Sequence, residues 1–186
     1  MLVSIIIFII VGLVLFIVVD IVFTYLKKRQ IENLNDFGIR QLKKGDLLFS
    51  REMGFNRMIP GYWSHSRIYF SGKVIEATTM GVKITPLRKF LRNRKVAVGR
   101  VEINQKNMRK IIDWAVARNN KNYNWLFFLN NHDDKFYCSE FVCNAFRQGG
   151  VDLKPSFIYV IRYALAIVPQ DVYGHKHVKI LGMLKR

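Results

Sequence analysis

The chain has 186 residues, of which 51% are hydrophobic, and 30 Lys and Arg against 13 Asp and Glu give a formal net charge of +17. This length is enough for one domain with its own hydrophobic core once an N-terminal segment is set aside. The charge favours anionic partners, but the sequence contains no zinc finger, RNP motif or heptad array. We therefore expect no nucleic-acid binding and assign the charge to contact with an anionic membrane surface.

The first 26 residues predict a transmembrane anchor. Residues 2–19 carry no charge, and the apolar character resumes after Asp20 and runs to Leu26. As a helix, residues 2–26 would span roughly 37 Å, which is enough to cross a bilayer with some tilt. A cleaved signal peptide is the alternative, but it needs a basic start, a shorter apolar core and a small-residue cleavage site.

A basic cluster follows the apolar segment directly, at Lys27, Lys28 and Arg29. Under the positive-inside tendency it places the C-terminal domain in the cytoplasm, so we expect a single-pass membrane protein with a cytoplasmic domain. We interpret residues 27–41 as a juxtamembrane linker or short helix, and residues 42–186 as the folded domain.

Short strands dominate the first half of this domain. After a charged turn at residues 43–46, an apolar run predicts a strand, and Ser71-Gly72 predicts a hairpin turn between two more. Pro86 suits the first turn of a short helix. The predicted strands cover residues 47–49, 66–70, 73–78, 82–85 and 95–103, and the short helix covers residues 86–92.

Helices dominate the second half. Apolar residues recur on one face of residues 107–118 and of residues 139–148, and Gly149 and Gly150 end the second of these helices. Residues 160–184 predict a helix before Pro169 and a strand near residues 178–183. Strands and helices thus occur in separate runs, which indicates an α+β fold.

The two cysteines are Cys138 and Cys143. They are too far apart in sequence for a Cys-x-x-Cys motif, and two cysteines make no disulfide framework in a domain of this size, so at least one is a free thiol. Cys138 comes just before a predicted helix, whose positive end would stabilise a thiolate. The first free N–H groups of that helix could also receive an oxyanion.

A base for this thiol has to come from elsewhere in the chain. His65 opens a predicted strand, and Glu76 lies on the neighbouring strand of the hairpin, where a carboxylate could fix the tautomer of the imidazole. From the residues alone, purely structural roles for these residues stay open, because a lone His is more often structural and a Cys in a helix is usually part of the core.

Several motifs in order resemble the permuted papain-like amidase family of the YaeF/YiiX type, related to NlpC-type cell-wall peptidases and to lecithin:retinol acyltransferase-like proteins. The resemblance covers roughly residues 42–184, nearly the whole domain, and the ordered series is more specific than any one motif. The matching segments are residues 45–49, 64–69, 74–77, 81–82, 86–91, 123–127, 137–142 and 168–172.

The resemblance implies a permuted papain-like fold, with an antiparallel sheet or barrel packed on helices and the His before the Cys. It implies that Cys138 attacks a carbonyl, that His65 takes the proton of the thiol and that Glu76 is the third polar residue. This chemistry needs only a thiol, a base and oxyanion donors, so we expect no cofactor and no metal. The chain departs from the family pattern at Ser66 and Arg67, where small or apolar residues are frequent, and also at Asn124, where Asp is frequent. We therefore expect a different substrate surface.

Other candidate residues have plainer interpretations. Cys143 lies inside the helix and is expected in the core. His175 and His177 could form half of a metal site, but no third ligand is evident, and we expect an exposed polar strand there. Glu140 is expected to hold the start of its helix.

Two aromatic residues and a polar loop leave alternatives open. Tyr123 and Trp125 could shape a substrate pocket or pack in the core. The loop that contains His132, Asp133 and Asp134 could line the cleft or simply form a turn.

The sequence therefore predicts a thiol-dependent hydrolase or acyltransferase that forms a cysteine acyl-enzyme with an amide or ester carbonyl. Its substrate could be a peptide, an isopeptide or a lipid at or near the membrane bilayer. Cell-wall peptide becomes the stronger option if the domain lies outside the cell. The alternative is a catalytically silent, membrane-associated binding module of the same fold.

Overall fold

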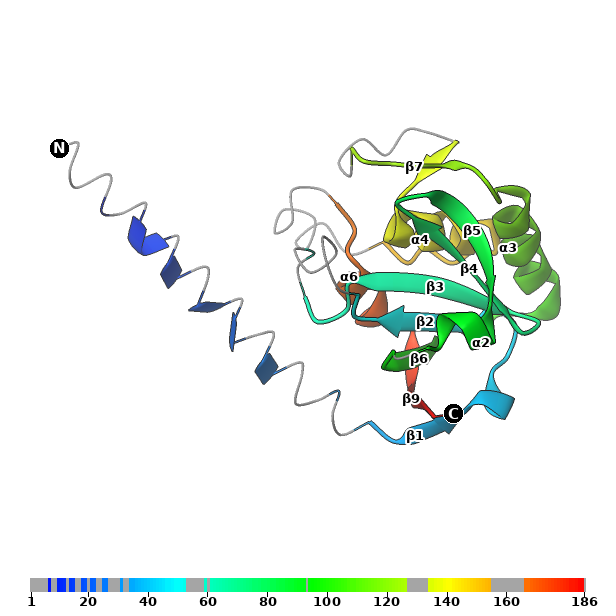
Figure 1. The fold of residues 1–186 in the computed structure, drawn as a ribbon, viewed down its shortest axis with the longest axis horizontal. Helices are drawn as coiled ribbons and strands as arrows, with labels where there is room; N and C mark the ends of the chain where they lie inside the picture. The colour runs from blue at the N-terminus through cyan, green and yellow to red at the C-terminus, as the bar shows by residue number, and fades with distance from the viewer. Residues whose placement is uncertain are drawn as a thin grey trace. The chain divides into compact units, whose positions relative to one another are not determined.

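The computed structural model describes residues 34–52, 59, 61–92, 94–126, 134–154 and 166–185, and scattered positions between residues 7 and 31. The chain divides into two compact units, Met1–Leu34 and Asn35–Arg186. In Figure 1 the first unit is dark blue, and the second begins in light blue and continues to red.

In the first unit, every described residue between 7 and 31 is helical. The described apolar side chains from Ile7 to Leu26 are 50% to 65% exposed. Among the described positions, no helix has both the length and the apolar character that a membrane crossing requires.

The second unit is built on a curved, mostly antiparallel sheet, which matches the predicted α+β class (Figure 1). Within the described residues it has seven strands, and β1 alone runs parallel to its neighbour, β9. In sheet order the strands are β1 (Asp36–Gly38), β9 (Lys179–Lys185), β6 (Val96–Arg100), β2 (Leu47–Ser50), β3 (His65–Phe70), β4 (Lys73–Thr78) and β5 (Gly81–Pro86).

Short helices and a second small sheet accompany the large sheet among the described residues of this unit. The helix α4 contacts β3, β4 and α3, so α3 and α4 form a helical layer beside the sheet. The helices are η1 (Ile39–Gln41), α2 (Leu87–Phe90), α3 (Gln105–Ala117), α4 (Cys138–Gln148) and α6 (Pro169–Tyr173), and β7 (Asn122–Tyr123) pairs in parallel with β8 (Lys135–Phe136).

The alternation of side chains along the central strands gives the sheet two different faces. One face packs against α2 and carries a buried apolar cluster. The cluster consists of Phe37, Leu48, Val74, Leu87, Phe90, Leu91, Val96 and Val98. Two residues further along β2 and β4, the same face carries Ser50 and Glu76. The apolar core therefore gives way to a polar site within one two-residue repeat of the strands.

The turn between β3 and β4 is the predicted hairpin. Ser71 and Gly72 have φ angles of 46° and 75°, and two successive positive φ values are typical of the two-residue turns that match strand twist. The register of this hairpin, with Ile68 opposite Ile75, is what brings Glu76 beside the start of β3.

The predicted linker is wrong in its second half. Residues 35–41 belong to the sheet unit, because Asp36–Gly38 forms β1 and Phe37 is buried in the apolar cluster. Three residues with no alternation give no local strand signal, and pairing with β9 at the far end of the chain creates this one. The helix predicted before Pro169 lies largely on residues outside the described part, while Pro169 itself begins α6.

Candidate active site

Cys138 is the first residue of α4 and is 3% exposed. The start of the helix is fixed by Glu140, whose Oε2 accepts hydrogen bonds from the N–H of Tyr137 and from Nδ2 of Asn124, both at 3.3 Å. The structural role predicted for Glu140 is thereby confirmed. Asn124 ties the residues after β7 to this helix start, so the thiol sits on a rigid support.

His65 is the first residue of β3 and is also buried. The backbone that leads into it is held by Gln170 of α6, whose Oε1 accepts the N–H of Tyr62 at 3.1 Å and of Trp63 at 3.4 Å. The hydroxyl of Ser64 accepts the N–H of Glu52 at 2.8 Å. Two segments far apart in sequence therefore fix where the imidazole enters the site.

The structure brings Cys138 and His65 together. Burial raises the pKa of the Cys138 thiol, but the charge of His65 and hydrogen bonds with His65, Ser139 and the Ser66 backbone outweigh it, so this pKa lies below its ordinary value. Burial and Arg67 lower the pKa of His65, but the Cys138 charge and hydrogen bonds with Cys138 and Glu76 raise it above its ordinary value. The two opposite shifts favour a thiolate–imidazolium pair.

Glu76 lies on the other side of His65. Its Oε2 is 3.0 Å from Nε2 of His65 and 2.6 Å from Nε of Arg67. Burial raises the pKa of Glu76, but Arg67 and His65 more than offset it and bring the pKa to about 2. The carboxylate is therefore ionised at any ordinary pH, as a partner of an imidazolium has to be.

Arg67 was predicted to alter the substrate surface, but its side chain is buried and turned into the protein. Besides Glu76, its guanidinium donates to Ser50 Oγ and to Glu52 Oε1, each at 2.6 Å, and it lies over the Phe90 ring at 4.3 Å. Continuing the hairpin register places Arg67 opposite Glu76 and on the same face of β3 as His65. That alternation was the available sequence signal for this network.

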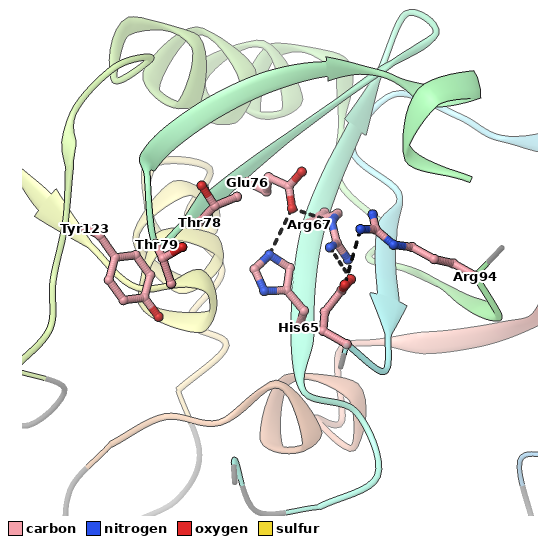
Figure 2. A pocket seen from close by; sticks show the side chains of 8 residues that line it. His65, Arg67, Glu76, Thr78, Thr79, Arg94 and Tyr123 are labelled. Atoms are coloured by element: carbon pink, nitrogen blue, oxygen red, sulfur yellow. Dashed lines mark hydrogen bonds and ion pairs between the residues drawn. The ribbon is translucent and has the colours of Figure 1, made fainter. Parts of the chain in front are cut away.

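A pocket of about 210 Å³ opens beside His65 and Glu76, and Figure 2 shows the side chains that line it. One ring nitrogen of His65 faces Glu76, and the other points away from it (Figure 2). The lining residues are Glu52, His65, Arg67, Glu76, Thr78, Thr79, Arg94 and Tyr123. Cys138 is not among them, although its charge contributes, after burial, to raising the pKa of Tyr123.

Tyr123 and Trp125 pack edge to face with centroids 5.0 Å apart. Tyr123 lines the pocket and Trp125 is 55% exposed, so neither is an ordinary core residue. Cys143 is fully buried, as expected of a core residue, and burial raises its pKa. Both cysteines are free thiols.

The histidine pair near the C-terminus does not form the expected strand. His175 and His177 lie in the turn between α6 and β9, where Nδ1 of His175 accepts the N–H of His177 at 3.3 Å. That hydrogen bond occupies one of the two ring nitrogens of His175. Of the predicted polar loop, Asp134 precedes β8, and His132 and Asp133 lie outside the described residues.

A solved structure with a similar fold is titled metalloprotein YiiX from Escherichia coli O157:H7. It has a TM-score of 0.62 and 22% sequence identity, over 75% of this chain and 96% of that chain. The described residues of this chain hold no cluster of three or more His, Cys, Asp or Glu arranged for a metal ion. At the site itself, Arg67 occupies both Glu76 and Glu52, which makes these carboxylates poor ligands for a cation.

The likeness to YiiX shows the fold, and a match at the level of sequence goes further. None of the curated proteins matches the chain. The family described as "Permuted papain-like amidase enzyme, YaeF/YiiX, C92 family" matches residues 41–181, nearly all of the sheet unit. The chain belongs to this family of permuted papain-like amidases.

Proposed function

We propose that this protein is a thiol-dependent amidase in which Cys138 is the nucleophile, His65 the acid and base, and Glu76 the partner that orients and stabilises the imidazolium. The observation that carries the proposal is the buried contact of a thiol and an imidazole whose pKa values shift in opposite directions, with a carboxylate behind the imidazole. An ordinary buried cysteine shows the reverse shift, as Cys143 does.

In the first half-reaction, the Cys138 thiolate attacks the carbonyl carbon and forms a carbon–sulfur bond. The oxyanion that results faces N–H groups of the first turn of α4, which have no partner inside a helix. His65 gives its proton to the leaving nitrogen, the carbon–nitrogen bond breaks, and a thioester with Cys138 is left.

In the second half-reaction, water gives a proton to His65 while its oxygen attacks the thioester carbon. The carbon–sulfur bond then breaks, the acid product leaves, and the thiolate–imidazolium pair is restored. An alcohol or amine in place of water would make the same intermediate an acyltransferase, so hydrolysis and transfer differ only in the acceptor.

The test is to trap the acyl-enzyme with p-nitrophenyl acetate and locate the acetyl group by peptide mass spectrometry. We expect it on Cys138, with none in Cys138→Ala and an unchanged amount in Cys143→Ala, the matched control on the same helix. Acetylation of Cys143 instead, or of neither cysteine, would leave the binding-module alternative as the better account of this fold.

The N-terminal unit supports a place for this chemistry at a membrane. Its described apolar side chains from Ile7 to Leu26 are at least half exposed, and the sequence of residues 2–19 carries no charge. A helix that is apolar on every face is stable in lipid rather than in water. The proposed arrangement is an anchor at residues 1–26, a cytoplasmic domain after the basic cluster at 27–29, and a peptide or lipid substrate near the bilayer.

A further inference from the structure

The oxygen of Glu76 that faces His65 is shared with a second cation. Oε2 lies 3.0 Å from Nε2 of His65 and only 2.6 Å from Nε of Arg67. A short charge-assisted hydrogen bond from a guanidinium reduces the negative potential that the same oxygen presents to an imidazolium. Arg67 therefore competes with His65 for the carboxylate of Glu76.

Arg67 cannot turn away from this contact. Its three nitrogens donate to Glu76, Ser50 and Glu52, and its guanidinium plane lies over the ring of Phe90. The side chain is 2% exposed, so water does not screen its charge. A fixed, buried cation next to an imidazole opposes the protonation of that imidazole.

Glu52 supplies the opposing charge on the far side of the guanidinium. Its Oε1 accepts from Arg67 at 2.6 Å and from Ser50 Oγ at 2.7 Å, and its Oε2 is 3.3 Å from Arg94. Burial raises the pKa of Glu52, but Arg67, Ser50 and His65 lower it below the ordinary value. Glu52 is thus an anion that neutralises Arg67.

The charges around His65 come from several elements of the sheet unit that lie far apart in the sequence. Cys138 and Glu76 favour the imidazolium, Arg67 disfavours it, and Glu52 acts on it directly and through Arg67. The titratable and charged groups are Cys138 of α4, Glu76 of β4, Arg67 of β3, Glu52 after β2, Arg94 before β6 and Tyr123 of β7.

We propose that Arg67 and Glu52 are a pair of positioning residues that set the protonation of His65 in opposite directions. Arg67 makes His65 release its proton more easily, and Glu52 counteracts this effect by neutralising Arg67. This rests on the proposed function for its purpose: an imidazolium held too firmly by a thiolate and a carboxylate could not release its proton to a leaving nitrogen. A histidine whose proton is held neither too firmly nor too weakly can both give and take that proton.

The test follows the imidazole itself and needs no substrate. In the full-length chain, the Cε1–H resonance of His65, identified by its loss in His65→Gln, is titrated by NMR in Arg67→Met, Glu52→Gln, the double variant and Arg94→Met. Arg94 is the matched control, because it also contacts Glu52 but not Glu76.

We expect the pKa of His65 to rise by about one pH unit in Arg67→Met and to fall by a similar amount in Glu52→Gln. The double variant should return close to the wild-type value, and Arg94→Met should change it little. A purely structural pair would lower stability without opposite shifts, so shifts of the same sign, or none, overturn the proposal.

Two arrangements keep the test decisive. If Arg67→Met does not fold, Arg67→Lys takes its place, because it keeps the positive charge and loses the planar guanidinium. The pKa of His65 should then stay near the wild-type value in Arg67→Lys and still fall in Glu52→Gln. A rise in the pKa of His65 in Glu52→Gln would overturn the proposal. Loss of acyl-enzyme formation with the opposite shifts intact would count against the proposed amidase function alone.

Discussion

Glu76 shows how one carboxylate can link stability to the chemistry of the site. Its pKa in the folded chain is about 2, against an ordinary value of 4.5. A depressed pKa means that the ionised group stabilises the folded state above the ordinary value, and that this stabilisation is lost as the pH falls from 4.5 towards 2. The full shift corresponds to about 3 kcal/mol as an upper estimate.

Replacing Glu76 by Gln should therefore flatten the pH dependence of stability in this window, because Gln has no charge to lose. The measurement is the free energy of unfolding in urea at several pH values between 2 and 5, for wild type and variant. Equal slopes in the two proteins would show that Glu76 is not held ionised by the folded state.

Cys138 and Cys143 are similar residues on one helix in different electrostatic surroundings. Burial raises the pKa of both thiols, but only Cys138 has an imidazole, a hydroxyl and a backbone N–H close enough to reverse the effect. The position at the first residue of α4, rather than burial, therefore separates a nucleophile from a core side chain.

At the scale of elements, the site depends on how α6 holds the segment before β3. The side-chain oxygen of Gln170 accepts two backbone N–H groups of this segment from more than a hundred residues away. A buried donor left without a partner costs about 1 to 3 kcal/mol.

Gln170→Leu should lower the free energy of unfolding by about 2 kcal/mol and slow acylation of Cys138, because the strand that carries His65 loses its anchor. Urea unfolding and the acylation rate measure the two effects. Gln148→Leu, at the exposed end of α4, is the control and should stay within about 0.5 kcal/mol of wild type. A stable Gln170→Leu protein with normal acylation would contradict this role.

The whole molecule carries its charge unevenly. Between residues 82 and 101 the sequence has Lys and Arg but no Asp or Glu. Three of these cations, Arg88, Lys89 and Arg92, line a shallow cavity of about 610 Å³ together with Pro86. We call these three residues the α2 basic surface; it is continuous along the chain with Arg94, which lines the pocket beside His65.

A protein without residues 1–34 should bind vesicles that contain anionic lipid, and binding should weaken with salt. Changing the α2 basic surface to alanine should weaken it more than the same change at Lys106, Arg109 and Lys110 of α3, which removes equal charge. Co-sedimentation with vesicles measures both. Equal losses would mean that net charge alone directs the protein to membranes.

The N-terminal segment gives a second prediction at this scale. The full chain should stay in the membrane fraction after alkaline carbonate extraction, and the chain without residues 1–34 should be released. Immunoblotting of the two fractions after expression in cells decides this. Release of the full chain would show that residues 1–26 do not anchor it.

Local pattern was enough to predict much of the fold. The hairpin at Ser71-Gly72, the strand at β2 and the helices α3 and α4 follow from turn residues, from a short apolar run and from a periodicity of 3.6. The ordered motifs also predicted the family, and with it the proposed roles of Cys138, His65 and Glu76. These features depend on neighbours within a few residues, or on motif order along the chain.

Only the tertiary structure decided how these groups are charged and held. β1 exists because it pairs with β9 across the length of the chain, and Gln170 reaches the entry to β3 from a helix over a hundred residues away. In the sequence, Arg67 is a departure from the family pattern that suggests a different substrate surface, yet the fold buries it between Glu76 and Glu52. The protonation of a buried group depends on distances of a few ångströms, and the sequence does not contain those distances until the chain is folded.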